Sequence, residues 1–334
     1  MTSIEIAGSD ALGYRARLTL PVLVVAYGLV AALVSPAIYF DMLADYAQQF
    51  AVLPPLVLLG LAAVALVRHR HAPHAYLRRV ATSRALPLAV TAGLVCVGLA
   101  AFTTFKILIP HVVPFWADPL FAGIDRALHG TDPGLIVHAL LPDWAGHAIG
   151  VLYGPVWFLA WFGTMAAMAL HPDAVLRQRY FWAMGLTVLL LGTVLATLLA
   201  SFGPIFFDDL AGSSRFDALL LQIAESPVGA YMAEASGYLL ASYGAERPSL
   251  GTGISAMPSM HLAIGTLHAL LLGRLNRWAG LLGWGYVALL LVGSVYLGWH
   301  YAIDGYVSIA AVSLIWWVTG RRLERRPAGM SAAY

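Results

Sequence analysis

Charged residues and cysteine are scarce in this sequence. Of its 334 residues, 11% are charged and 60% are hydrophobic, and the mean hydropathy is +0.78. Because soluble domains carry about 25% charged residues, this composition excludes a soluble domain and indicates a membrane protein. The single cysteine, Cys96, excludes a disulfide framework and a cysteine-rich metal cluster. The sequence shows neither a cleavable signal-peptide pattern nor internal repeats, so we expect no processing and no repeat architecture.

Long apolar runs, by contrast, are abundant. Runs of about 17 to 25 apolar residues are long enough to cross a bilayer as helices. We therefore expect an all-α integral membrane protein with about eight transmembrane helices, counted directly from such runs. The predicted spans are 17–40, 47–67, 86–107, 148–170, 180–202, 254–273, 279–298 and 301–319.

The basic residues are unevenly shared between the two sets of loops. Alternating the loops between sides leaves Lys106, Arg126, Arg215 and Arg247 on one side and the other fifteen of the 19 basic residues on the opposite side. Cytoplasmic loops are rich in Lys and Arg, so we expect both termini in the cytoplasm, with a basic tail over residues 321–334. The long loops 108–147 and 203–253 would then lie outside the cytoplasm.

Those two long loops contain patterns typical of short interfacial helices. In residues 117–130, we expect Asp118 to cap a helix that has Pro119 in its first turn and ends at Gly130. The expected apolar face of this helix consists of Leu120, Phe121, Ile124 and Leu128. Similar signals begin at residue 132 and cover residues 213–225. Together these helices predict a cap at the membrane surface.

Five polar side chains occur near the outer ends of three predicted spans, where charge is costly and a functional role is the default interpretation. They are Lys106, Ser259, His261, His300 and Asp304. His300 and Asp304 are four residues apart, so on a helix the carboxylate can bind one ring nitrogen and leave the other free. This is the arrangement of an activated histidine nucleophile.

Residues 253–261 read GISAMPSMH and predict an anion-binding site. Pro258 suits the first position of a helix, and the first backbone N–H groups of that helix would remain unpaired and attract phosphate. A glycine such as Gly253 allows the backbone to approach an anion closely.

Other interpretations of these residues remain open. Lys106 can simply extend to the membrane interface, and His268, deeper in the same span, is expected to be a core residue. His261, His300 and Asp304 can ligate zinc, although the sequence has no HExxH pattern and Lys106 would repel a cation. A transporter also carries charge within the membrane, but its polar residues should cross the full depth of the bilayer.

Three motifs together resemble the type 2 phosphatidic acid phosphatase (PAP2) superfamily of membrane lipid phosphatases and phosphotransferases. The pattern of that superfamily is K-x6-RP, then PSGH, then SR-x5-H-x3-D. The corresponding residues of this chain are Lys106 with Val113 and Pro114, then Pro258, Ser259, Met260 and His261, then Gly293 and Ser294 with His300 and Asp304. The three motifs are specific in combination, and each is weak alone.

The chain departs from the superfamily pattern at the phosphate-binding arginines, which are replaced by Val113 and Ser294, and at the motif glycine, which is Met260. In lacking these arginines and in having HYAID at residues 300–304, the chain resembles one branch of the superfamily. That branch contains inositol phosphorylceramide synthases, sphingomyelin synthases and bacterial inositolphosphotransferase-like proteins. Arg247, and after it Arg215, are the candidates for the missing positive charge.

The resemblance implies a six-helix catalytic domain over residues 85–320, preceded by a two-helix extension over residues 1–84. It also implies that His300 attacks phosphorus, that Asp304 orients His300, and that His261 acts first as an acid and then as a base. The phosphate-binding residues would be Lys106, Ser259, Arg247 and Gly253. Neither a metal nor a cofactor is needed for this chemistry.

We expect a lipid head-group phosphotransferase of the inositol phosphorylceramide synthase type, with a phospholipid donor and a lipid or polyol alcohol as acceptor. The alternative is a PAP2 lipid phosphatase, in which water takes the place of the acceptor. A polytopic transporter is the third possibility. The expected location is the bacterial inner membrane, with the active site on the periplasmic side, and no nucleic acid partner is expected.

Overall fold

The computed structural model describes residues 3–51, 53–244 and 251–323. Within these residues all regular secondary structure is helical, as the sequence predicts. The described residues divide into two units: one contains those in 3–104, residues 163–178 and residue 323, and the other contains residues 105–162 and the described part of 179–322.

The first unit holds the N-terminal helices. They are α1 (Ser3–Val34), α2 (Pro36–Phe50), α3 (Leu53–Arg68) and most of α4 (Pro73–Val112), with the second half of α8 (Pro155–Leu170) and the start of α9 (Ala174–Leu186). The first predicted span extends to residue 40, but α1 ends before Pro36, because proline restricts the preceding residue and lacks the N–H of a helical bond. Helix α4 runs through residue 85, so the predicted domain boundary falls inside a helix and the division stays a prediction.

The second unit holds the remaining helices, many of them short. They are α5 (Asp118–His129), α6 (Pro133–Leu140), α7 (Trp144–Tyr153), the π-helix η1 (Thr187–Leu195), α10 (Ala196–Leu198), the 3-10 helices η2 (Pro204–Phe206) and η3 (Ser214–Phe216), α11 (Phe207–Ala211), α12 (Asp217–Glu225), α13 (Gly229–Gly244), α14 (Met260–Leu275), α15 (Arg277–Tyr296) and α16 (Ala302–Leu323).

Five helical segments of the described chain are long and apolar enough to cross a membrane. They are Pro73–Val112, Trp144–Leu170, Ala174–Leu198, Arg277–Tyr296 and Ala302–Leu323. Shorter apolar helices occupy the other three predicted spans, at Thr19–Val34, Leu58–Arg68 and Met260–Leu275. This is the all-α architecture of an integral membrane protein, whereas the count of eight spans stays a prediction.

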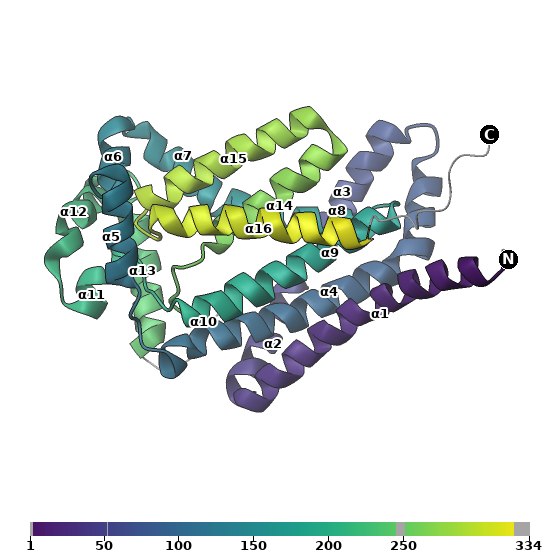
Figure 1. The fold of residues 1–334 in the computed structure, drawn as a ribbon. Coiled ribbons are helices and arrows are strands. Elements are labelled where there is room, and N and C mark those ends of the chain that lie inside the picture. Colours follow the sequence, from purple (N-terminus) through teal and green to yellow (C-terminus); the bar gives the residue numbers. More distant parts are fainter. Residues whose placement is uncertain (1–2, 52, 245–250, 324–334) are drawn as a thin grey trace. The chain divides into compact units, whose positions relative to one another are not determined.

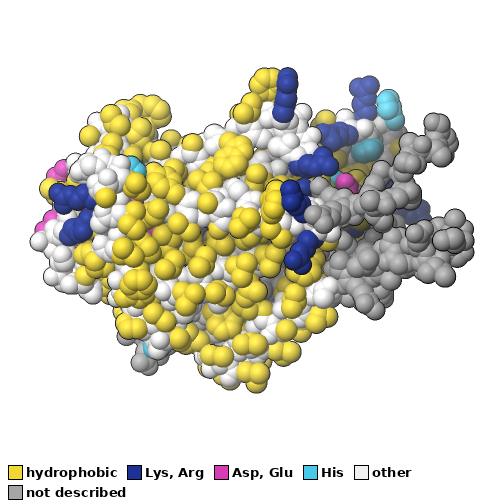
Figure 2. Space-filling model, viewed as in Figure 1, with side chains coloured by type: hydrophobic (Ala, Val, Ile, Leu, Met, Phe, Trp, Pro, Cys, Tyr) yellow, Lys and Arg dark blue, Asp and Glu magenta, His cyan; other side chains and the backbone are white. Residues whose placement is uncertain are grey.

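Helices α14, α15 and α16 pack together (Figure 1). Gly280 of α15 lies against the backbone of Gly273, and Gly305 of α16 leaves room for Leu262 and Leu291. The basic residues of these helices are at the end of α14, the start of α15 and the end of α16, namely Arg274, Arg277, Arg321 and Arg322. Leu281, Leu282 and Leu314 of these helices are exposed, and hydrophobic side chains cover most of the face shown in Figure 2.

Short helices gather around the opposite end of this group, where α16 begins (Figure 1, left). Helices α5, α6 and α12 lie where the sequence predicts interfacial helices, and Gly130 ends α5 in the left-handed conformation with φ of +81°. Helix α13 has no counterpart among the predicted elements.

The buried face of α5 differs from the predicted one. Leu120 and Leu128 are exposed, whereas two acidic residues, Asp118 and Asp125, are buried beside Phe121. The N-cap residue is Ala117, whose side chain makes no capping hydrogen bond, and Asp118 is the first helical residue. The predicted cap is therefore wrong, because both carboxylates bind other segments instead.

Candidate functional site

His300 and Asp304 are in contact at the start of α16. Nδ1 of His300 lies 3.2 Å from Oδ2 of Asp304, and the backbone N–H of Tyr301 donates to the same oxygen at 3.1 Å. Asp304 is fully buried and His300 is 8% exposed. His300 precedes the helix by two residues, so the contact joins the loop to the first helical turn rather than lying along one helical face. Since Nδ1 faces the carboxylate, Nε2 is the ring nitrogen left for other chemistry.

Asp125 of α5 holds the start of α16 in place. Its two carboxylate oxygens accept hydrogen bonds from the backbone N–H groups of Ala302 at 2.6 Å and Ile303 at 3.0 Å. The first N–H groups of a helix have no partner within the helix, so this carboxylate acts as a cap supplied by another helix. Burial raises the pKa of the Asp125 carboxyl group, and these two hydrogen bonds oppose the rise.

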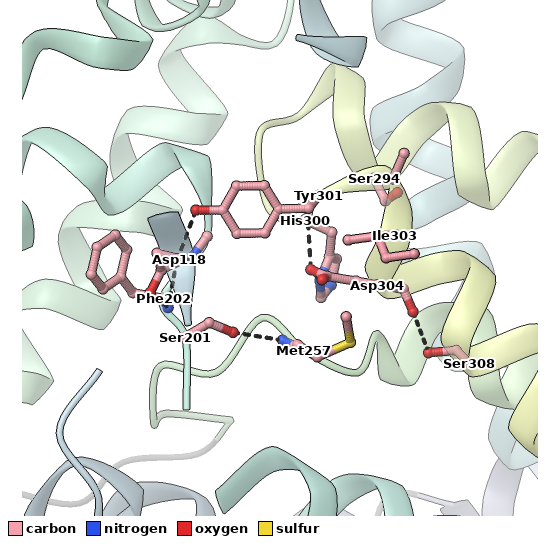
Figure 3. Close-up of polar contacts among 12 residues, drawn as sticks. Asp118, Ser201, Phe202, Met257, Ser294, His300, Tyr301, Ile303, Asp304 and Ser308 are labelled. Atoms are coloured by element: carbon pink, nitrogen blue, oxygen red, sulfur yellow. Dashed lines mark hydrogen bonds and ion pairs between the residues drawn. The ribbon is translucent and has the colours of Figure 1, made fainter. Parts of the chain in front are cut away.

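Asp118 joins two segments that are distant in sequence (Figure 3). Its carboxylate accepts hydrogen bonds from the backbone N–H groups of Phe202 at 3.0 Å and Gly203 at 2.9 Å, and from the Tyr301 hydroxyl at 2.9 Å. Burial raises the pKa of the Asp118 carboxyl group, and these hydrogen bonds oppose the rise. Because Tyr301 directly follows His300, Asp118 fixes the loop that carries the candidate nucleophile.

Ser201 connects the same segment to the loop before α14 (Figure 3). Its carbonyl oxygen accepts a hydrogen bond from Ala256 N–H at 2.9 Å, and its hydroxyl oxygen accepts one from Met257 N–H at 3.0 Å. Helix α14 then begins at Met260 with Ser259 as its N-cap. Pro258 therefore precedes the cap and is not the first helical residue, which corrects the sequence-based position. The N–H groups of the first turn of α14 have no acceptor within the helix.

Gly253 brings this loop against the backbone of α4 at Lys106. Its φ is +90°, and a Cβ atom at this position would lie 3.0 Å from the Lys106 carbonyl carbon and 3.0 Å from the Ile107 nitrogen. Both the conformation and the close approach therefore require glycine. Lys106 is partly buried, and no carboxylate within the described residues forms an ion pair with it.

His261 lies against two aromatic side chains of the broken span Trp144–Leu170. Its ring stacks on Tyr153 with a centroid distance of 4.1 Å and an interplanar angle of 16°, and lies 4.0 Å from the Trp157 ring centroid. Trp157 also donates a hydrogen bond to the His261 carbonyl oxygen at 3.3 Å. His261 is close enough to His300 and Lys106 for their charges to interact. Three predicted site segments thus meet at one end of the second unit.

Other predicted residues are placed elsewhere or not described. Arg247 lies outside the described residues. Arg215 donates a hydrogen bond to the Ala122 carbonyl oxygen at 2.8 Å and lies 3.5 Å from Asp132, so it joins the short helices. His268 shares a hydrogen bond with the Tyr180 hydroxyl at 3.3 Å in the core. Within the described chain, no three His, Cys, Asp or Glu side chains are grouped to hold a metal ion.

A small cleft opens beside His300 and Tyr301. Asp125, Pro204 and Phe216 contribute to its walls. Lys106, Ser259 and His261 do not line it. The cleft therefore contains His300 but none of these three candidate groups.

A comparison with protein families decides the class of this chain. The PAP2 superfamily model matches residues 120–318. The chain belongs to the PAP2 superfamily. No curated protein and no solved structure gave a match. The region matched by the PAP2 superfamily includes Ser259, His261, His300 and Asp304, and begins after Lys106. Membership in the PAP2 superfamily supports an activity of the phosphatase or phosphotransferase type on lipids in a bilayer.

Two positions at which the superfamily pattern has arginine, residues 113 and 294, carry side chains without positive charge in this chain. Val113 packs against the apolar cluster of Ile109, Ala196 and Ala200. Ser294 is fully buried, and its hydroxyl donates to the Leu291 carbonyl oxygen at 2.7 Å. Within the described part of the chain, these two positions therefore contribute no positive charge to the candidate site.

Proposed function

We propose that this protein is a lipid head-group phosphotransferase that works through a phospho-histidine intermediate. The observation that carries the proposal is the contact between His300 and the fully buried carboxylate of Asp304. That carboxylate accepts the Nδ1–H of His300 and so leaves the lone pair of Nε2 available to attack phosphorus. The polar groups cluster at one end of the helices, which favours an enzyme site over the polar path of a transporter.

The first half-reaction moves the head group from the donor to the protein. Nε2 of His300 attacks the phosphorus of a phospholipid and forms an N–P bond, while the P–O bond to the lipid alcohol breaks. His261 gives a proton to the departing oxygen. Lys106, Ser259 and the N–H groups at the start of α14 stabilise the negative charge that develops on the phosphoryl oxygens.

The second half-reaction reverses these steps with a different alcohol. The acceptor hydroxyl gives its proton to His261, its oxygen attacks phosphorus, and the N–P bond to His300 breaks. His261 and His300 return to their starting states. If water replaces the acceptor, the same steps constitute a phosphatase.

Absence of the two motif arginines supports a place in the branch that includes inositol phosphorylceramide synthases. Val113 and Ser294 occupy the arginine positions without offering a donor to substrate. We therefore propose ceramide or a diacylglycerol-like alcohol as the acceptor class. The basic ends of α14 and α16 lie opposite the site, which supports a periplasmic site in a bacterial inner membrane with cytoplasmic termini.

The proposed intermediate can be tested directly with His300→Ala. The wild-type protein, incubated in detergent with phospholipid labelled at phosphorus, should carry a label that survives denaturation and is lost in acid. His300→Ala should show neither label nor turnover while its unfolding temperature stays unchanged. His147→Ala, which removes an exposed histidine, serves as the matched control and should behave as wild type. Full turnover by His300→Ala would refute the mechanism.

A second experiment separates the transferase from the phosphatase. Vesicles that contain the protein and a labelled phosphodiester lipid, such as phosphatidylinositol, are incubated with and without ceramide or diacylglycerol. A transferase forms a new labelled lipid only when the acceptor is present. Release of water-soluble phosphate at the same rate with and without acceptor would favour the phosphatase.

A further inference from the structure

Two hydroxyl groups beside His261 are buried without a hydrogen bond of normal geometry. They belong to Tyr153, which is 4% exposed, and to Ser259, which is fully buried at the start of α14. The two hydroxyls lie near each other, and their mutual contact falls outside normal hydrogen-bond geometry, so neither has another acceptor within the described chain. Buried hydroxyls are normally paired, because an unpaired one has lost its hydrogen bonds to water without replacement. Their shared position at a helix N-terminus points to a missing acceptor, and a phosphoryl oxygen has that chemistry.

The local fold holds Tyr153 in this position. Gly154 and Pro155 interrupt the span between α7 and α8 directly after Tyr153. The interruption is stabilised by the Tyr286 hydroxyl, which donates to the Leu152 carbonyl oxygen at 2.6 Å. An interruption inside a membrane span is tolerated where other groups pair with the freed backbone atoms. Tyr153 therefore ends a helix at a fixed point opposite α14.

The ring of Tyr153 is confined by its neighbours. It stacks on His261 with an interplanar angle of 16°. A Cβ atom added at Gly293 would lie 3.2 Å from the Tyr153 ring, so the ring lies close to the α15 backbone. Gly293 is the residue before Ser294, at which the superfamily pattern has arginine. Tyr153 thus lies beside the segment from which an arginine side chain is missing.

We propose that the Tyr153 hydroxyl, together with that of Ser259, donates a hydrogen bond to a phosphoryl oxygen of the substrate. This inference rests on the proposed function and narrows its substrate class. Tyrosine and serine hydroxyls are neutral donors, so they replace hydrogen bonds of the missing arginines but not their charge. Among the described groups of the proposed site, Lys106 supplies the positive charge. Such a site suits a phosphodiester, which has one negative charge, better than a phosphomonoester, which has two.

Tyr153→Phe tests the proposal because it removes one oxygen and keeps the stacked ring. Binding of orthovanadate, measured by titration calorimetry, should weaken about 10- to 100-fold, the usual effect of losing a hydrogen bond to a charged group. The kcat/KM for phosphatidylinositol should fall by a similar factor. The unfolding temperature without ligand should be unchanged or higher, because the deleted hydroxyl makes no hydrogen bond of normal geometry in the free protein.

Tyr180→Phe is the matched control, since Tyr180 is also fully buried but its hydroxyl is bonded to His268. This variant should lose thermal stability and keep its affinity for orthovanadate. Wild-type orthovanadate affinity in Tyr153→Phe would overturn the inference, and so would misfolding of Tyr153→Phe, because it would show that the hydroxyl has a structural partner. The proposed function fails separately, through turnover by His300→Ala.

The substrate class is tested by comparing phosphatidylinositol with phosphatidic acid in the wild-type protein. We expect a higher kcat/KM for the phosphodiester. A higher kcat/KM for phosphatidic acid would show that the neutral hydroxyl donors do not make the site select a singly charged substrate. It would overturn that part of the inference.

Discussion

At the scale of single residues, Asp304 is the group on which the proposed nucleophile, His300, would depend. Its Oδ2 atom serves both His300 and the Tyr301 N–H, while its Oδ1 atom makes no hydrogen bond within the described chain. Asp304→Asn keeps the volume but weakens the preference for the Nδ1–H tautomer of His300. We expect kcat to fall about 100-fold or more with little change in unfolding temperature, as for other catalytic carboxylate–histidine pairs. A kcat within twofold of wild type, measured by phospholipid turnover, would contradict this role.

Gly253 offers a second test at this scale, because a neighbouring glycine provides a control. Gly253→Ala introduces a Cβ atom 3.0 Å from the Lys106 backbone in addition to backbone strain at positive φ. Gly251→Ala introduces similar strain at φ of +72°, but its Cβ atom would meet no atom within 4 Å. Both variants should lose about 1 kcal/mol of stability, whereas Gly253→Ala alone should lose phospholipid turnover. Equal activities would show that the approach to Lys106 is not needed.

At the scale of helices, Asp125 couples α5 to the start of α16. Asp125→Ala removes both acceptors from the N–H groups of Ala302 and Ile303. We expect a loss of about 1–2 kcal/mol in the free energy of unfolding, as for other helix caps, and a lower kcat because the loop before α16 carries His300. Asp125→Asn keeps one acceptor and should be intermediate. Asp217→Ala, at the exposed start of α12, is the control for chemical denaturation and activity measurements.

The helices that the sequence predicts are those with strong local signals. Proline near the start and glycine at the end identify α5, because these residues restrict the backbone regardless of tertiary contacts. The partners of Asp118 and Asp125 were not predicted, since Phe202 and Ala302 lie far along the chain and no spacing rule connects them. Tyr153 was missed for the same reason. The Pro155 within an otherwise apolar span was the local signal that an interruption occurs there.

At the scale of the whole protein, orientation in the membrane was predicted from the distribution of arginine between loops, and it remains the prediction with the widest consequence. The described structure places the basic ends of α14, α15 and α16 opposite the beginning of α16. The proposed site therefore faces the side away from these arginines, and the proposed donor lipid would have to be present in that leaflet. If the same site faced the cytoplasm, the donor lipid would have to be in the cytoplasmic leaflet instead.

Cysteine labelling decides between these orientations. The chain has one cysteine, Cys96, which is buried, so the variant Cys96→Ser is a suitable background. Arg126→Cys on α5 and Arg277→Cys on α15 then place single exposed thiols at the site end and the basic end. In intact cells a membrane-impermeant maleimide should label Arg126→Cys, and it should label Arg277→Cys only after the membrane is permeabilised, because cytoplasmic loops carry the excess of basic residues. The reverse pattern would place the site in the cytoplasm.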